Sequence, residues 1–200
     1  MRVIIADDHD VVRFGLRALL EADGSFEVVA ETGDLSELKL LVHNQPVDLV
    51  ILDYSMPGGH SVAVANYLKK RYPHIKILIF TAQQSAIILK ELYLSLVDGI
   101  LLKQNHTREL LTALADLNKG NRYISKQVLH IVSDLNLDLT GRELQILHLI
   151  LQGLSRSSIA EQLDVSAETI KTHRRNLMRK LEVNNVTQLV AKANQLDLSG

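Results

Sequence analysis

Polar side chains that could do chemistry stand directly after short apolar runs in the first half of the sequence. Asp7 and Asp8 follow the first run, and Asp53, Thr81 and Lys103 each follow a later one. Because the carboxyl ends of parallel strands meet at one edge of a sheet, we expect these side chains to lie together. Three carboxylates in one crevice repel one another unless a cation shares them, and their hard oxygen atoms suit Mg²⁺. The pattern therefore predicts a magnesium site.

A carboxylate in such a site can also act as a nucleophile. Asp53 ends the central strand, and an Asp that attacks a phosphoryl group forms an acyl phosphate. Mg²⁺, the Thr81 hydroxyl and the Lys103 ammonium would contact the transferred phosphoryl oxygens and neutralise their charge. Taken singly, each residue is better explained as a helix cap, a turn residue or a solvated charge. Their joint occurrence on successive strands favours phosphoryl chemistry.

The apolar runs that position these residues predict a parallel sheet. Strands buried on both faces are apolar at nearly every position. The segments between them show helical spacing of apolar residues, as in Val12, Leu16 and Leu20. Five such repeats predict an α/β fold, a doubly wound five-stranded parallel sheet with helices on both faces. The predicted strands are Val3–Ala6, Glu27–Ala30, Leu49–Leu52, Ile77–Phe80 and Ile100–Leu102.

From Leu139 onward the sequence predicts only helices. Thr140 and Glu143 form a capping box before the first helix, and Gly153 ends it. The later helices are predicted over Ser157–Leu163, Ala167–Leu181 and Val186–Ala193. The predicted helices Ser157–Leu163 and Ala167–Leu181 have the length and spacing of a helix-turn-helix.

A basic stripe lies on the second helix of this pair. Between Lys171 and Lys180 the sequence has five Lys or Arg residues and no acidic residue. If Ile170 and Leu177 face the core, the basic side chains fill the outer surface, from which they can reach bases and phosphates. A lone charge run is more often a solvated helix face, but the absence of acids and the capped turn before it favour contact with nucleic acid.

Composition limits the remaining classes of function. The 200 residues include no Cys and no Trp, and 46% of them are hydrophobic. This excludes a disulfide scaffold, a thiol nucleophile and a thiolate zinc site. No apolar run approaches the roughly 20 residues that span a bilayer, so we expect a cytoplasmic protein with no membrane part. Residues 1–138 carry 14 Lys and Arg against 17 Asp and Glu, whereas residues 139–200 carry 8 against 6.

Four segments resemble the receiver domain of two-component response regulators: Asp7-Asp8, Asp53–Gly58, Thr81-Ala82 and Gly99–Lys103. The resemblance covers about the first 120 residues and implies a flavodoxin-like fold. It implies that a sensor histidine kinase donates a phosphoryl group to Asp53. Asp7 or Asp8 and the Ser55 backbone carbonyl would help to hold Mg²⁺. Thr81 and Lys103 would bind the phosphoryl oxygens.

Two positions depart from the receiver pattern. Most receivers have an aromatic residue where Ile100 stands, and its rotation follows the phosphoryl-bound Thr, which Ile cannot reproduce. The segment Ser95–Asp98 is bulkier than usual, so the neighbouring surface is expected to be more apolar and to suit a partner. Gly99–Gln104 is similar to capsule-regulating members, in which accessory partners take part. The alternative is a receiver controlled by an accessory protein or a ligand, largely without phosphorylation.

A second alternative is an enzyme. Asp8-His9-Asp10 also resembles the nucleophile motif of haloacid-dehalogenase-type phosphatases, which use Asp, Thr and Lys on a comparable sheet. That family needs a further acidic pair after its Lys, and Gln104-Asn105-His106 provides none. A Mg²⁺-dependent phosphatase is therefore the weaker hypothesis, and we expect a regulator rather than an enzyme.

The second half resembles the LuxR-type helix-turn-helix. The motifs are Leu139–Glu143, Gly153–Ser155, Ile159-Ala160, Leu163, Val165-Ser166, Thr169–His173 and Lys180-Leu181. The resemblance implies that Lys171, Thr172 and Arg175 face the bases of double-stranded DNA. Thr169, His173 and Arg174 would touch phosphates, and Arg179 belongs to the same outer surface. The final helix would carry the contacts of a homodimer that reads paired half-sites.

Together the two halves resemble a NarL/FixJ-type response regulator. We predict a receiver domain over residues 1–120, a linker with one short helix over 121–138 and a helix-turn-helix DNA-binding domain over 139–200. Phosphorylation of Asp53 is expected to shift the receiver between two states and thereby favour dimerisation and DNA binding.

Overall fold

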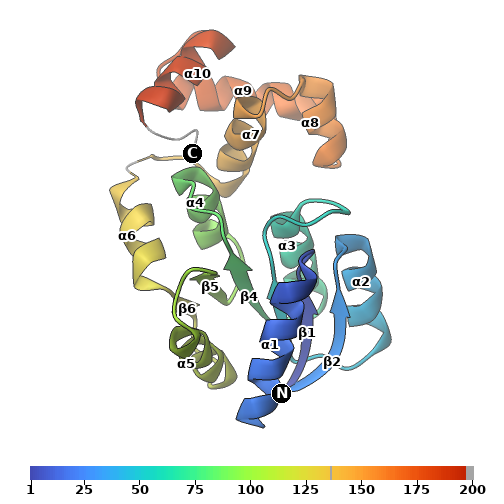
Figure 1. Ribbon diagram of the computed structural model, residues 1–200. Coiled ribbons are helices and arrows are strands. Elements are labelled where there is room, and N and C mark those ends of the chain that lie inside the picture. Colours follow the sequence, from blue (N-terminus) through green and yellow to red (C-terminus); the bar gives the residue numbers. More distant parts are fainter. Residues whose placement is uncertain (136, 197–200) are drawn as a thin grey trace. The chain divides into compact units, whose positions relative to one another are not determined.

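The computed structural model of the chain describes residues 1–135 and 137–196 (Figure 1). They form two compact units. The first unit comprises residues 1–82 and 96–128, and the second comprises residues 83–95 and the described part of 129–200. The predicted linker and C-terminal domain include residues 136 and 197–200, which lie outside the described residues. The predicted domain boundaries stay predictions.

The first unit is built on a parallel sheet with the strand order β2-β1-β3-β4-β5-β6. The strands are β1 (Arg2–Ala6), β2 (Glu27–Thr32), β3 (Leu49–Leu52), β4 (Lys76–Thr81), β5 (Gly99–Leu102) and β6 (Tyr123–Ile124). From β1 the chain continues to β2 on one side of the sheet, and from β3 it continues to β4 on the other side. The strand order therefore reverses between β1 and β3, and in such a sheet a crevice forms at the carboxyl ends of these two strands. The α/β doubly wound parallel fold is therefore confirmed.

Strand β6 corrects the predicted number of strands, which was five. The Tyr123 and Ser125 backbone N–H groups donate to the Asp98 and Ile100 carbonyls, at 2.9 and 3.0 Å. A strand of two residues is too short to show an alternating pattern, and its formation depends on the open edge of β5. The predicted linker consequently begins as part of the sheet.

Helices cover both faces of this sheet. They are α1 (Asp10–Asp23), α2 (Leu35–Asn44), α3 (Ser61–Arg71) and α5 (Thr107–Asn118). Helices α1 and α5 lie on one face, and α2 and α3 lie on the other (Figure 1). Leu20 of α1 and Leu114 of α5 are fully buried in one core with Ile5 of the sheet. The strands are therefore apolar at nearly every position because both faces are covered.

The second unit is helical. Its helices are α4 (Ala86–Leu94), α7 (Gly141–Leu151), α8 (Arg156–Gln162), α9 (Ala167–Lys180) and α10 (Val186–Gln195), and α6 (Lys126–Asp134) crosses the division between the units. Its core includes Leu147, Ile159, Ile170 and Leu189, all fully buried. Ile87 of α4 belongs to the same core. The sequence did not predict that α4 would pack with these helices.

Polar side chains begin the helices of this unit. Thr140 and Glu143 form the predicted capping box before α7, which is confirmed. Ser166 accepts a hydrogen bond from the Thr169 N–H and caps α9. Helix α8 begins at Arg156 rather than at the predicted position because Ser155 is its cap. Within residues 1–135 and 137–196, none of the helices has the length and apolar character needed to cross a membrane.

Candidate functional site

The acidic pocket, which we define as Asp7, Asp8, His9, Asp53 and Lys103, lies at the carboxyl ends of β1, β3 and β5. The Asp53 N–H donates to the Ala6 carbonyl at 2.8 Å, so the pairing of β1 with β3 places Asp53 beside the end of β1. Asp7 and Asp53 are buried, whereas Asp8 is exposed. The sheet therefore brings the predicted carboxylates together.

Lys103 joins the two buried carboxylates. Its Nζ lies 2.7 Å from Asp7 Oδ2 and 3.2 Å from Asp53 Oδ2. Its backbone N–H donates to the carbonyl of Thr81, a fully buried residue at the end of β4, at 2.8 Å. A half-buried ammonium between two carboxylates compensates part of the desolvation of these charges. Thr81 and Lys103 thus lie next to each other, as expected for residues at the carboxyl ends of parallel strands.

His9 is a pocket residue to which the sequence analysis gave no role. Its Nδ1 lies 2.7 Å from Asp8 Oδ1 and 3.2 Å from Asp7 Oδ1. Ligand atoms of Asp7, Asp8, His9 and Asp53 all lie within 4.8 Å of one another. This cluster is dominated by carboxylate oxygens, and such a donor set fits Mg²⁺. Ser55 lies in the exposed loop two residues after Asp53, and its carbonyl remains a predicted ligand.

The surroundings of Asp53 control its charge. Burial raises the pKa of the Asp53 carboxyl above its ordinary value, and the neighbouring Asp7 also raises it, while Lys103 acts in the opposite direction. The Tyr54 N–H donates to Asp53 Oδ1 at 2.8 Å and favours the ionised form. A divalent cation in the pocket would favour that form further. Because only the ionised carboxylate is a good nucleophile, the arrangement suits acceptance of a phosphoryl group that depends on a cation.

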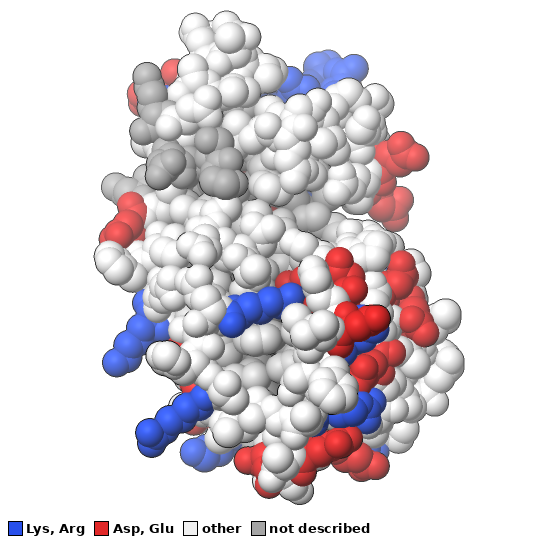
Figure 2. Space-filling view, in the orientation of Figure 1, with Lys and Arg blue, Asp and Glu red and all other residues white. Residues whose placement is uncertain are grey.

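An apolar surface adjoins the pocket along α1. Val11 is 83% exposed and Phe14 is 74% exposed, both within two turns of Asp8. A groove of about 470 Å³ between α1 and α5 reaches from Leu19 to Lys103. Figure 2 shows the face that carries α1, on which acidic and basic side chains lie among uncharged surface. Exposed large apolar side chains beside a polar site are typical of a surface that binds another protein.

Helix α9 presents the predicted basic surface. Ile170 and Leu177 are fully buried, as expected for the inward face. Thr169, His173 and Arg174 are half-buried, and the other predicted DNA-binding residues of α9 are exposed, namely Lys171, Thr172, Arg175 and Arg179. The long donors on the exposed face can reach the major groove of DNA.

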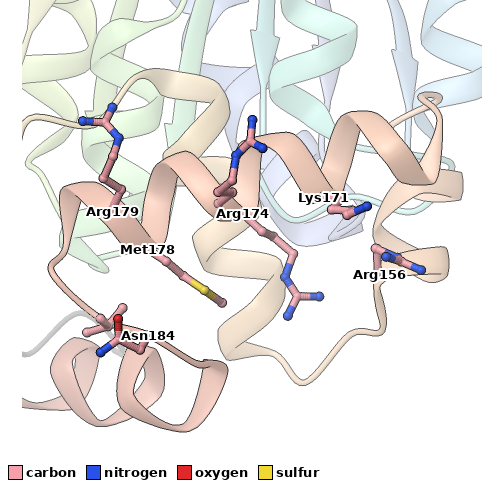
Figure 3. Close-up of a pocket in the computed structure, with 8 residues that line it drawn as sticks. Arg156, Lys171, Arg174, Met178, Arg179 and Asn184 are labelled. Carbon is pink, nitrogen blue, oxygen red and sulfur yellow. The ribbon is translucent and has the colours of Figure 1, made fainter.

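The basic side chains of this surface line a groove of about 610 Å³ (Figure 3). The lining residues are Arg156, Lys171, Arg174, Arg175, Met178, Arg179, Val183 and Asn184. Arg156 lies near Lys171 at one end, and Asn184 lies near Met178 toward the other. Arg156 and Asn184 were not predicted as part of this surface, because they come from α8 and from the turn before α10. Only the packing of these elements around α9 brings them to the groove.

Lys180 is not part of this basic surface, which corrects the extent of the predicted stripe. Its Nζ lies 2.9 Å from Glu143 Oε2, and Glu143 is buried at the start of α7. Lys180 therefore ties α9 to α7. Lys171 also has an acidic neighbour, with Nζ 3.1 Å from Glu168 Oε1, but both side chains are exposed and such pairs are weak.

Two known protein families match the chain, one in its N-terminal part and one in its C-terminal part. Residues 3–115 match the family described as response regulator receiver domain, and residues 137–193 match the family described as bacterial regulatory proteins, luxR family. The chain therefore belongs to the NarL/FixJ family of response regulators, which are two-component DNA-binding transcription regulators with a LuxR-type domain.

Two known relatives match most of the chain. The nitrate/nitrite response regulator protein NarP of Escherichia coli (strain K12) is 36% identical over 191 residues, which cover 91% of this chain and 89% of NarP. The transcriptional regulatory protein RcsB of the same organism is 31% identical over 211 residues, which cover 100% and 96%. Both are named as regulators, so the phosphatase alternative gains no support from them.

Solved structures of RcsB are similar to this chain over nearly its whole length. RcsB from Salmonella enterica serovar Typhimurium, bound to promoter P1flhDC in the presence of the phosphomimetic BeF3-, is 32% identical with a TM-score of 0.79 and 98% coverage of each chain. The structure of two RcsB dimers bound to two parallel DNAs is 33% identical with a TM-score of 0.79, and covers 97% of this chain and 98% of RcsB.

Proposed function

We propose that the chain is a phosphorylation-controlled regulator that accepts a phosphoryl group on Asp53 with Mg²⁺ and binds double-stranded DNA as a homodimer. The observation that carries this proposal is the acidic pocket, in which Lys103 bridges Asp7 and Asp53. The same chain carries a basic groove along α9. A site that can hold a phosphoryl group and a surface that can hold DNA are the two parts that such a regulator needs.

The pocket residues divide the work of phosphoryl transfer. Asp7, Asp8, Asp53 and the Ser55 carbonyl would hold Mg²⁺, which neutralises charge on the phosphoryl oxygens. Asp53 attacks phosphorus as the P–N bond to the phosphohistidine of a sensor histidine kinase breaks. Thr81 and Lys103 bind the oxygens of the group that arrives. The exposed Val11 and Phe14 supply an apolar surface for the kinase beside the pocket.

DNA binding is proposed for the outer face of α9. Lys171, Thr172 and Arg175 would contact bases, and Thr169, His173, Arg174 and Arg179 would contact phosphates. Support comes from the similarity to RcsB, whose solved structures include a promoter complex and dimers on DNA. The contacts of the homodimer are assigned to α10.

The test is DNA affinity with and without phosphorylation. A DNA fragment selected by the wild-type protein is titrated before and after treatment with Mg²⁺ and a small phosphodonor, for wild type and Asp53→Ala. We expect at least about tenfold tighter binding for treated wild type and no change for the variant. Equal affinity of treated and untreated wild type would contradict the switch. It would favour control by an accessory protein, for which the exposed Leu96 beside the buried Val97 is a contact candidate.

A further inference from the structure

Side-chain hydrogen bonds lead from the Lys103 turn to β6. The Leu102 N–H donates to Asn105 Oδ1 at 3.1 Å and closes the turn that contains Lys103. Asn105 Nδ2 donates to Glu109 Oε2 at 2.8 Å. The Tyr123 hydroxyl donates to Glu109 Oε1 at 3.2 Å. The three bonds, all partly buried, connect the end of β5, the first turn of α5 and the start of the linker.

The bonds leave little freedom to the groups that make them. The Asn105 amide must turn its oxygen to the Leu102 N–H and its NH₂ to Glu109. Each oxygen of the Glu109 carboxylate has one of the two donors. Hydrogen bonds to an ionised carboxylate are stronger than neutral ones. A displacement of the turn is therefore passed on to Tyr123 rather than absorbed by rotation of a side chain.

Tyr123 occupies a position where such a displacement matters. Its strand, β6, has two residues, and the Tyr123 and Ser125 N–H groups tie it to the edge of β5. The hydroxyl bond to Glu109 holds the same strand from the side of α5. Burial raises the pKa of Tyr123 to about 12, and Glu109 raises it as well, so the hydroxyl keeps its proton and remains a donor at neutral pH.

We propose that Asn105, Glu109 and Tyr123 form a relay that transmits a displacement of Lys103 to the linker strand β6. The relay rests on the proposed function, phosphorylation of Asp53. A phosphoryl group on Asp53 draws the Lys103 ammonium from the carboxylates to the phosphoryl oxygens. The turn that carries Lys103 follows, and the relay moves β6. Ile100, which lies on β5 between the pocket and β6, has no polar side-chain atom with which to carry the same signal.

The test measures the response of β6 itself. Amide hydrogen exchange at residues 123 and 125 is followed by NMR with and without Mg²⁺ and beryllofluoride, in wild type, Tyr123→Phe and the control Tyr67→Phe. Tyr67 lies on α3 and is 52% exposed. We expect the exchange rates of wild type and the control to change by roughly tenfold, the scale of one hydrogen bond to a charged group. Tyr123→Phe should change by less than about threefold.

A second variant breaks the relay at its centre. Asn105→Asp keeps an acceptor oxygen for the Leu102 N–H but has no NH₂ group to donate to Glu109, so the bond between residues 105 and 109 is lost while the bond from the Tyr123 hydroxyl to Glu109 is kept. The pairing of β6 is retained, and we expect its response to beryllofluoride to be lost as in Tyr123→Phe. If Tyr123→Phe by itself loosens β6, the response of this second variant tests the relay in its place.

The outcomes separate the relay from the proposed function. Intact mass after treatment with Mg²⁺ and a small phosphodonor is recorded for every protein. Equal gains in mass, together with a wild-type response of β6 in Asn105→Asp, would overturn the relay and leave the proposed function standing. The absence of any gain in wild type would overturn both.

Discussion

The charged side chains of the acidic pocket follow the ends of three strands that are far apart in the sequence, whereas those of the basic groove come mostly from the 14 residues of α9. In the pocket, Asp7 and Asp53 are buried and bonded to Lys103. In the groove, Lys171 and Arg175 are exposed. The fold therefore buries and pairs the charges of the pocket, whereas it only points the side chains of the groove outward.

This difference decides how each region responds to change. A buried charge that loses its partner must be protonated or pay the full desolvation penalty. An exposed charge that is removed leaves the fold as it was, because water had already solvated it. Substitutions in the pocket should therefore affect both chemistry and stability, whereas substitutions in the groove should affect binding alone.

The largest effect is expected for Lys103→Ala. Loss of the ammonium leaves the phosphoryl oxygens without a cationic side chain and raises the pKa of the Asp53 carboxyl further, because Lys103 lowers it. We expect phosphorylation by a small phosphodonor to slow by about a hundredfold or more, as when one stabilising donor is removed from an active site. The rate of mass gain measures this. Lys119→Ala, which removes an exposed lysine of the same unit, should react as wild type does.

Lys171→Ala and Arg175→Ala test the exposed half of the comparison. Each should weaken binding to selected DNA by about 1–3 kcal/mol if a bidentate base contact is lost. The free energy of unfolding should change by less than about 0.5 kcal/mol, since both side chains are exposed. Fluorescence anisotropy and urea unfolding measure the two quantities. Lys70→Ala, an exposed lysine of α3, is the control for net charge, and a similar loss of affinity there would contradict a specific role for α9.

Glu91 of α4 offers a buried carboxyl in the second unit. Burial raises its pKa to about 8, against the opposing effect of the Arg142 guanidinium. The folded state thus holds the proton more tightly than the unfolded state, so this stabilisation is complete below pH 4.5 and is lost as the pH rises toward 8. Glu91→Gln should raise the free energy of unfolding by about 1–2 kcal/mol at pH 8 and change it little at pH 4.

Urea unfolding of Glu91→Gln at the two pH values measures this effect. Glu161→Gln on α8, which changes an exposed carboxyl, serves as the control and should show no such pH dependence. An equal effect of Glu91→Gln at pH 4 and pH 8 would show that its side chain is not a source of pH-dependent stability.

The smallest effect is expected for Thr140→Ala. The Thr140 hydroxyl accepts the Glu143 N–H at 3.3 Å and caps α7. Its loss should lower the free energy of unfolding by about 1 kcal/mol. Thermal unfolding measures the change, and Thr187→Ala, an exposed threonine within α10, is the control. If the two variants had equal stability, the capping box would not contribute.

The residues of the pocket could be predicted because their signal is local. A polar side chain at the end of an apolar strand has a known place in a parallel sheet, and Asp7, Asp53 and Lys103 needed only that rule. The core of the helical unit was predictable for a similar reason, because the spacing of Ile170 and Leu177 already defines one helix face. The roles of these residues in phosphorylation and DNA binding stay predictions.

Features that arise only from packing could not be predicted. Strand β6 exists because β5 has a free edge, and Tyr123 and Ile124 alone show no strand pattern. Lys180 belongs to the basic stripe in sequence, but the approach of α9 to α7 directs it to Glu143. Helix α4 contributes Ile87 to the core of the second unit. Most residues of α4 are apolar, and this composition was a signal of burial on more than one side.

The most direct test of the central claim is intact mass after incubation with a small phosphodonor, with and without Mg²⁺, for wild type and Asp53→Ala. The arrangement of Asp7, Asp53 and Lys103 predicts that wild type gains one phosphoryl group only when Mg²⁺ is present, and that the variant gains none. No gain in wild type under any condition, or an equal gain in Asp53→Ala, would contradict it.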